Sequence, residues 1–382
     1  MELDNINKHA DEADFASTCT NYQYLPAILP SKERIIVIGD IHGDYNLAVE
    51  CLRIAKLIDD NMNWIGGNTV VVQVGDQLDN CRPFDKKCND PMTDSNITTS
   101  SHNHTNEAED IKVLNFFTEM HNKAAKQGGM VISLIGNHEI MNVMGNFNYV
   151  SYNDVDKFKN YKDPNDPDKK FATGEEGRRH AFARGNEYAK IMACTRVSSI
   201  IIGDFLFTHA GVVPKFADKL NIKSKKDLYK LNYHIRRWLL GLINKDYIAD
   251  IVNSSSYSIF WDRILGSLPP SLNNNDPKCV EYLDPVLQLF KVGHMIIGHT
   301  PQYFINKDGI NETCNKKLWR VDIGGSFGFN AFDNKYTNYG KMVDVRNAQV
   351  LEIIDNKIIR VIKKCPTCTL KKFCDKCKLK KN

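Results

Sequence analysis

The sequence of 382 residues predicts an α/β fold in which two mixed sheets form a sandwich. Short β-branched runs recur along the chain, and several stop at a glycine that is followed by Asp, Asn or His. Two further runs near the end of the chain fit antiparallel additions to the sheets. Open α/β sheets bind ligands at the carboxyl ends of their strands. Polar clusters that are far apart in the sequence are therefore expected to meet in space.

The spacing of apolar residues predicts the individual elements. Four runs are typical of buried strands, namely residues 34–38, 69–74, 130–135 and 292–297. Residues 45–60 place apolar side chains at helical spacing, and residues 200–207 read as two strands of a hairpin with a Gly-Asp turn. The late runs, residues 318–322 and 350–361, are predicted to be antiparallel strands.

The predicted domain occupies residues 31–362. Residues 1–30 have weak periodicity and are expected to form an irregular lead-in, while residues 363–382 form a basic tail. Residues 81–110 and 151–170 are polar and rich in turn-forming residues, so both are predicted to be loop insertions. His102 and His104 lie in the first insertion, where we favour a surface loop over a metal site.

The overall composition indicates an ordinary globular protein with 42% hydrophobic and 25% charged residues. No run of eighteen apolar residues could span a bilayer. The N-terminus lacks the basic-then-apolar layout of a signal peptide. These features predict a cytoplasmic or otherwise intracellular location, with the nucleus left open.

Eleven cysteines are expected to stay reduced, because an intracellular compartment disfavours disulfides. Seven are scattered and are interpreted as structural or incidental: Cys19, Cys51, Cys81, Cys88, Cys194, Cys279 and Cys314. The other four form two CxxC units in the tail: Cys365, Cys368, Cys374 and Cys377. They suit a structural zinc site, although an unstructured reduced tail and redox behaviour remain alternatives.

Positive charge is concentrated at the end of the chain. Residues 357–382 contain ten Lys or Arg and one acid, a net charge of +9, which leaves the remaining chain at −5. The tail could make weak contact with nucleic acid or another acidic surface, although such tails are usually solvated.

The clusters after the predicted strands contain six candidate metal ligands: Asp40, His42, Asp76, Asn137, His209 and His299. Asp40 and His42 are two residues apart at the end of a strand, so both can face one cation. The two oxygens of Asp76 can bridge two cations. This mixture of oxygen and imidazole donors suits manganese, iron or zinc better than calcium or magnesium. Two metals about 3.5–4 Å apart would share a hydroxide for in-line attack on a phosphate ester.

The same clusters contain a candidate proton donor. His138 follows Asn137 directly and is expected to protonate the leaving alkoxide as a general acid. Asp79 is expected to orient the protonated imidazole of His138.

Five motifs contain these residues in a fixed order. They are Gly-Asp-Ile-His-Gly (39–43), Gly-Asp-Gln-Leu-Asp (75–79), Gly-Asn-His-Glu (136–139), His-Ala-Gly (209–211) and Gly-His-Thr (298–300). The set resembles the phosphoprotein phosphatase branch of the calcineurin-like metallophosphoesterases over residues 35–345. Residues 178–214 and 260–263 look like the Shewanella-like phosphatases. The resemblance implies a four-layer α/β-β/α sandwich that hydrolyses phosphomonoesters, often on proteins.

The chain departs from that family pattern at one position. Where the family has Asp-Arg-Gly, this sequence has Asp79-Asn80-Cys81, and Asn80 cannot replace the arginine that binds the substrate phosphate. Four other arginines are candidates for this role: Arg82, Arg178, Arg179 and Arg263.

The sequence therefore predicts a two-metal phosphatase acting on phosphoserine or phosphothreonine in a protein substrate. A dinucleoside tetraphosphatase shares the early motifs and is a second hypothesis. A third is a scaffold protein that has kept the fold and lost turnover, which Asn80 alone supports.

Overall fold

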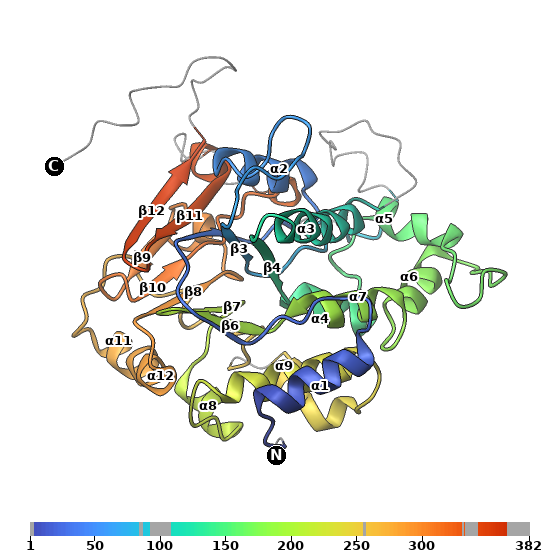
Figure 1. The fold of residues 1–382 in the computed structure, drawn as a ribbon. Helices are drawn as coiled ribbons and strands as arrows, with labels where there is room; N and C mark the ends of the chain where they lie inside the picture. The colour runs from blue at the N-terminus through green and yellow to red at the C-terminus, as the bar shows by residue number, and fades with distance from the viewer. Residues whose placement is uncertain are drawn as a thin grey trace.

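Two six-stranded mixed sheets form the centre of the molecule (Figure 1). The computed structural model describes residues 4–83, 87–91, 108–254, 257–330, 332 and 343–364. Helices cover both outer faces of the paired sheets, which makes a four-layer α/β-β/α sandwich. The predicted fold class is confirmed.

The first sheet has the strand order β12-β11-β2-β3-β4-β5. Its parallel strands are β2 (Arg34–Ile38), β3 (Val70–Gln73), β4 (Met130–Leu134) and β5 (Arg196–Val197). Strand β11 (Gln349–Ile354) pairs antiparallel with both β2 and β12 (Ile358–Lys363). The predicted strands at residues 34–38, 69–74 and 130–135 are confirmed, and the late run at residues 350–361, predicted to be antiparallel, is divided between β11 and β12.

The second sheet has the strand order β1-β6-β7-β8-β10-β9. These strands are β1 (Ile28–Leu29), β6 (Ser199–Ile202), β7 (Phe205–Thr208), β8 (His294–Ile297), β10 (Leu318–Arg320) and β9 (Asn311–Thr313). The β6–β7 hairpin is confirmed. Strand β10 is antiparallel to β9 but parallel to β8, so the predicted orientation was wrong on one side. The connection from β8 passes through β9 before β10 begins, so β10 runs in the same direction as β8.

Side chains along β2 point alternately to the two faces of the first sheet. Ile35 and Val37 point between the sheets, where they pack in one cluster with Phe207 of the second sheet. Ile36 and Ile38 point the other way and pack beneath the helices. Because successive side chains of a strand face opposite sides, a strand whose residues are all apolar must be covered on both faces.

Helices α2 (Tyr45–Ile54) and α3 (Glu109–Ala125) cover the first sheet. Helices α7 (Glu187–Thr195), α9 (Asp227–Leu239) and α12 (Asp284–Phe290) belong to the core cluster that covers the second sheet. The remaining α-helices are α4 (Asn137–Val143), α6 (Gly174–Phe182), α8 (Pro214–Lys219), α10 (Ala249–Val252), α11 (Pro277–Tyr282) and α13 (Gln302–Ile305). Short 3₁₀ turns are η3 (Lys245–Ile248), η4 (Phe327–Phe329) and η6 (Val343–Arg346).

Two segments predicted to be irregular contain helices. Helix α1 (Lys8–Thr18) lies in the supposed lead-in, and it packs beside α9 (Figure 1). Its apolar periodicity is weak, and ion pairs help to hold the helix in place. Arg236 of α9 bonds to Asp11 at 2.7 Å and to Asp14 at 2.9 Å. The second insertion begins with α5 (Tyr152–Asp156) and η2 (Lys157–Asn160).

Six of the scattered cysteines form three disulfides: Cys19–Cys194, Cys81–Cys88 and Cys279–Cys314. The expectation that these cysteines stay reduced is therefore wrong. Residues as distant as 175 positions pair, and only the fold brings them within reach. Cys51 is the one free cysteine among the described residues. The four tail cysteines, His102 and His104 lie outside the described residues, so those predictions stay predictions.

Among the described residues, every helix is too short or too polar to cross a membrane.

Replacing Arg236 with alanine is expected to destabilise the protein by about 3 kcal/mol, because the buried Asp11 carboxylate would lose its cation. Urea unfolding measures the change. Arg184→Ala is the matched control, since Arg184 is exposed and bonds one carbonyl. Equal stability of the two variants would show that α1 does not depend on this ion pair.

Candidate metal centre and active site

The six candidate metal ligands meet where the two sheets adjoin. Those from the first sheet follow β2, β3 and β4, and those from the second follow β7 and β8. Each has 4% or less of its surface exposed: Asp40, His42, Asp76, Asn137, His209 and His299. The predicted convergence of strand ends thus brings all six into one buried site.

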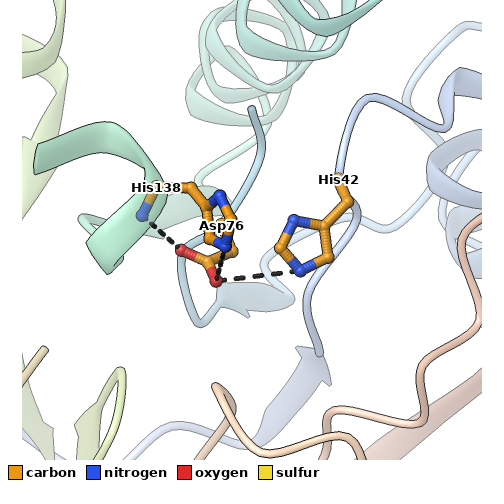
Figure 2. A group of neighbouring side chains, drawn as sticks. All are labelled: His42, Asp76 and His138. Carbon is orange, nitrogen blue, oxygen red and sulfur yellow. Dashed lines mark hydrogen bonds and ion pairs between the residues drawn. The ribbon is translucent and has the colours of Figure 1, made fainter. Parts of the chain in front are cut away.

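Asp76 lies at the centre of this site. Its Oδ2 atom is 3.7 Å from Nε2 of His42 and 3.9 Å from Nε2 of His138, and Figure 2 shows both imidazoles directed at the carboxylate. Its Oδ1 atom is 3.4 Å from Nε2 of His209 and accepts the backbone N–H of His138 at 3.0 Å. One carboxylate therefore faces ligands from both sheets.

Asn137 connects the ligands of the second sheet. Its Oδ1 atom lies 3.0 Å from Nε2 of His209 and 2.8 Å from Nδ1 of His299. Two histidines are further oriented by backbone carbonyls, since Nδ1 of His42 lies 3.2 Å from the Leu78 oxygen and Nδ1 of His209 lies 2.8 Å from the Val74 oxygen. Such bonds fix the ring so that the other nitrogen faces a metal.

Two motif glycines have no side chain, and the space beside them is occupied by the carboxylates of Asp76 and Asp40. A Cβ atom on Gly136 would lie 2.2 Å from Oδ1 of Asp76, and a Cβ atom on Gly298 would lie 2.2 Å from Oδ1 of Asp40. Any larger residue at either position would displace a ligand oxygen.

The backbone at the site is strained. His42, Asp76, Asp79 and His299 all have φ between 46° and 68°, a region that non-glycine residues seldom adopt. Left-handed residues that cluster at one site indicate a functional constraint, because the surrounding structure must offset their cost.

The buried charges at this site fit divalent cations. Burial, together with the charges of Asp322 and Asp76, raises the pKa of Asp40 well above its usual range. Oδ1 of Asp40 and Nε2 of His299 are buried and have no hydrogen-bond partner. Two groups of ligand atoms also lie within 4.8 Å: His42, Asp76 and His138 form one, and Asp76, His209 and His299 form the other. Because they share Asp76, the donors suit two adjacent cations.

His138 and Asp79 form the pair that the sequence predicts. Nδ1 of His138 is 2.6 Å from Oδ2 of Asp79, and Asn142 donates to the other Asp79 oxygen at 2.7 Å. His138 has 7% of its surface exposed and therefore lies at the open side of the cluster. The Asp79 contact fixes the orientation of the His138 imidazole, whose Nε2 atom is 3.9 Å from Asp76.

Arg82 and Arg263 lie on opposite sides of the ligand cluster. The Arg82 guanidinium lies 4.6 Å from the ring centre of Phe329, and that ring lies 5.7 Å from the ring of His42. Arg263 bonds the backbone oxygen of His299 at 3.1 Å. Arg263 is exposed, whereas Arg82 is only partly exposed and its guanidinium donates to two backbone oxygens.

The other two candidate arginines do not face the site. Arg178 is fully buried, and it bonds Asp110 at 2.6 Å and Asn142 at 2.8 Å. Arg178 therefore supports Asp110 and Asn142, which both bond Asp79. Arg179 is exposed and bonds Glu175 and the Gly145 oxygen. The prediction that these two bind substrate phosphate is therefore corrected, since their guanidinium groups are engaged elsewhere.

Glu139 is a central residue to which the sequence interpretation assigned no role. Its buried carboxylate accepts four backbone N–H groups, from Gly136, Asp76, Gln77 and Leu78, at 2.7 to 3.1 Å. These bonds join the turn after β3 to the turn after β4. Its position in the first turn of α4, directly after a strand, was the available signal.

Asp322 was also missed. It follows β10, has 1% of its surface exposed, and its Oδ2 atom is unpartnered. Burial raises the pKa of Asp322 to about 6, and the Asp76 charge adds to the effect. Its position two residues after a strand was the available signal, although Asp322 precedes Gly324 instead of following a glycine.

Replacing Glu139 with glutamine is expected to lower the free energy of unfolding by about 2–4 kcal/mol, because the amide NH₂ would face buried N–H donors. Metal content should fall as well, since Asp76 would lose its fixed turn. Urea unfolding and elemental analysis measure the two effects. Glu175→Gln is the control, because that side chain is 53% exposed and pairs only at the surface. A Glu139→Gln protein that matches the control would refute this role.

Three relatives are similar to this chain in sequence. The chain is 43% identical over 259 residues to an uncharacterised protein of Acanthamoeba polyphaga mimivirus, covering 65% of this chain and 97% of the relative. It is 27% identical over 324 residues to Shewanella-like protein phosphatase 2 of Arabidopsis thaliana, covering 78% and 72%. It is 28% identical over 337 residues to Shewanella-like protein phosphatase 1 of Plasmodium berghei, covering 87% and 76%.

Solved structures share the fold. The cold-active protein tyrosine phosphatase of a psychrophilic Shewanella species superimposes with a TM-score of 0.57 at 21% identity, covering 89% of this chain and 83% of that one. Residues 33–303 match the calcineurin-like phosphoesterase family. The chain therefore belongs to the calcineurin-like phosphoesterases and is a metal-dependent phosphoesterase with Shewanella-like protein phosphatases among its relatives.

Proposed function

We propose that this protein is a two-metal phosphoprotein phosphatase that hydrolyses phosphoserine and phosphothreonine. Two groups of candidate ligand atoms that share Asp76 support this assignment most directly, and His138 of the first group is also held by Asp79 at 2.6 Å. Two relatives are named protein phosphatases, which supports a phosphorylated protein as the substrate.

Six residues would hold the cations: Asp40, His42, Asp76, Asn137, His209 and His299. When bound, two divalent cations such as manganese, iron or zinc neutralise phosphoryl charge and activate water for in-line attack. Arg82 and Arg263 would orient the phosphate from opposite sides through charge-assisted bonds. His138 would deliver the proton from Nε2 to the leaving oxygen, while Asp79 holds Nδ1.

Aromatic rings at the site favour phosphotyrosine as a second candidate substrate. The ring of Tyr149 lies 5.0 Å from that of His138, and the ring of Phe329 lies 5.7 Å from that of His42. Trp261 adds a third ring beside His299 at 6.4 Å. An aryl group could pack against the Trp261 ring, since the Tyr149 and Phe329 rings flank the Arg82 guanidinium.

We place the protein inside the cell, in a compartment that permits disulfides. Three disulfides between described residues favour an oxidising environment over the reducing cytosol. The basic tail would add weak contact with acidic surfaces.

Replacing His138 with glutamine should lower kcat for a phosphoserine peptide by about 10²–10⁴-fold, because the alkoxide would leave without its proton. The loss should be much smaller for p-nitrophenyl phosphate, whose leaving group needs no proton. Steady-state kinetics with added manganese measure both substrates.

The Asp76→Asn variant is the comparison, since it should lose activity on both substrates together with bound metal. An equal loss on both substrates in the His138→Gln protein would argue against a general acid. Retained activity in both variants would refute the mechanism altogether.

A substrate panel should separate the remaining alternatives. The wild-type protein, loaded with manganese, should bind two metal ions and hydrolyse phosphoserine and phosphothreonine peptides but not diadenosine tetraphosphate. Preference for a phosphotyrosine peptide would instead select the second candidate. Fewer than two bound metals and no turnover of any substrate would identify a scaffold protein.

A further inference from the structure

The Cys81–Cys88 disulfide closes a short loop at the edge of the metal centre. The two Cα atoms are 5.8 Å apart, and the cysteines are 2% and 1% exposed. Arg82 is the first residue inside this loop, immediately after Cys81. No other disulfide between described residues is adjacent in sequence to a candidate substrate ligand.

The neighbouring residue Asn80 is turned away from the phosphate. Its Nδ2 atom donates to Asp154 at 2.7 Å, and its Oδ1 atom accepts the backbone N–H of Ser151 at 3.1 Å. Asn80 is 3% exposed and both ends of its amide are used. The position where the family has a phosphate-binding arginine therefore has a structural role in this chain.

The segment from Tyr149 to Tyr152 anchors both ends of the loop. The backbone N–H of Cys81 donates to the Tyr149 oxygen at 3.0 Å, and the backbone N–H of Tyr152 donates to the Cys88 oxygen at 3.1 Å. The disulfide therefore joins two residues whose backbones both bond to the segment from Tyr149 to Tyr152. Within these limits the backbone at Arg82 has little freedom.

Arg82 is aimed at the site by contacts that this backbone makes possible. Its Nη1 atom donates to the backbone oxygens of Asp79 at 3.0 Å and of Cys81 at 2.8 Å. Its guanidinium lies 4.6 Å from the ring centre of Phe329 and 5.5 Å from that of Tyr149. The guanidinium thus lies beside two rings, and the Phe329 ring is itself 5.7 Å from that of His42.

We propose that the Cys81–Cys88 disulfide is a positioning element that holds Arg82 over the metal centre as the replacement for the arginine missing at Asn80. The proposal rests on the proposed function, since it assigns the disulfide a part in binding the substrate phosphate. Opening the disulfide leaves only the two backbone bonds to the segment from Tyr149 to Tyr152, so the backbone at Arg82 gains freedom and Arg82 binds phosphate less tightly. Metal binding and the His138–Asp79 pair stay intact.

The Cys81→Ser/Cys88→Ser double variant tests the proposal in the manganese-loaded full chain. The inhibition constant of inorganic phosphate and the KM for a phosphopeptide should both rise about tenfold, as for loss of a charge-assisted bond. Cys279→Ser/Cys314→Ser is the matched control and should leave both constants unchanged. Elemental analysis must show equal metal content in all proteins.

Combining the double variant with Arg82→Ala separates positioning from general loosening. If the disulfide acts through Arg82, the Arg82→Ala protein and the triple variant should have the same phosphate inhibition constant. A further loss in the triple variant, or unchanged phosphate affinity in the double variant, would overturn the proposal. Absence of turnover in the wild-type protein would refute the proposed function instead, and isothermal titration with phosphate would still test the disulfide.

Should the double variant fail to fold, the folded wild-type protein can be treated with a trialkylphosphine. The phosphine becomes the phosphine oxide with oxygen from water, and the disulfide takes up two electrons and two protons as two thiols. Mass spectrometry identifies proteins in which only Cys81 and Cys88 are reduced. Weaker phosphate binding by that species supports the proposal, and unchanged binding overturns it.

Discussion

The carboxylate of Glu139 is the interaction on which the rest of the site depends. It accepts four backbone N–H groups and so ties the turn after β3 to the start of α4. Asp76 lies in the first of these turns and Asn137 and His138 lie in the second. A shift of either turn would separate the shared metal ligand from the proton donor. The Glu139 carboxylate therefore sets the position of Asp76 relative to Asn137 and His138.

The centre concentrates features that lower stability. Buried carboxylates repel one another, and four residues adopt left-handed backbone conformations. These costs persist because the sheets on both sides supply rigid strand ends and carbonyl partners for the histidines. Divalent cations would neutralise the repulsion among the acids. Folding and metal binding are thus coupled by the same buried charge.

The substrate side of the site is built differently from the metal side. Metal ligands come from the ends of regular strands, whereas Arg82 comes from a loop held by a disulfide and by the segment around Tyr149. Where the family has a phosphate-binding arginine, this chain has Asn80, whose side chain donates to Asp154 in the second insertion. That insertion therefore shapes the site, although its sequence reads as a surface loop.

The sequence alone determined most of the strands, the sandwich and a cluster of candidate metal ligands, because strand periodicity and the glycine that ends each strand are local properties. His138 beside Asp79 followed from the same motifs, whereas Glu139 and Asp322 were missed although the signal was present. Only the tertiary structure decided which arginines face the site, since Arg178 is enclosed by Asp110 and Asn142. It alone also paired Cys19 with Cys194 and held α1 through Arg236. These outcomes depend on contacts between distant segments, and no local pattern encodes such contacts.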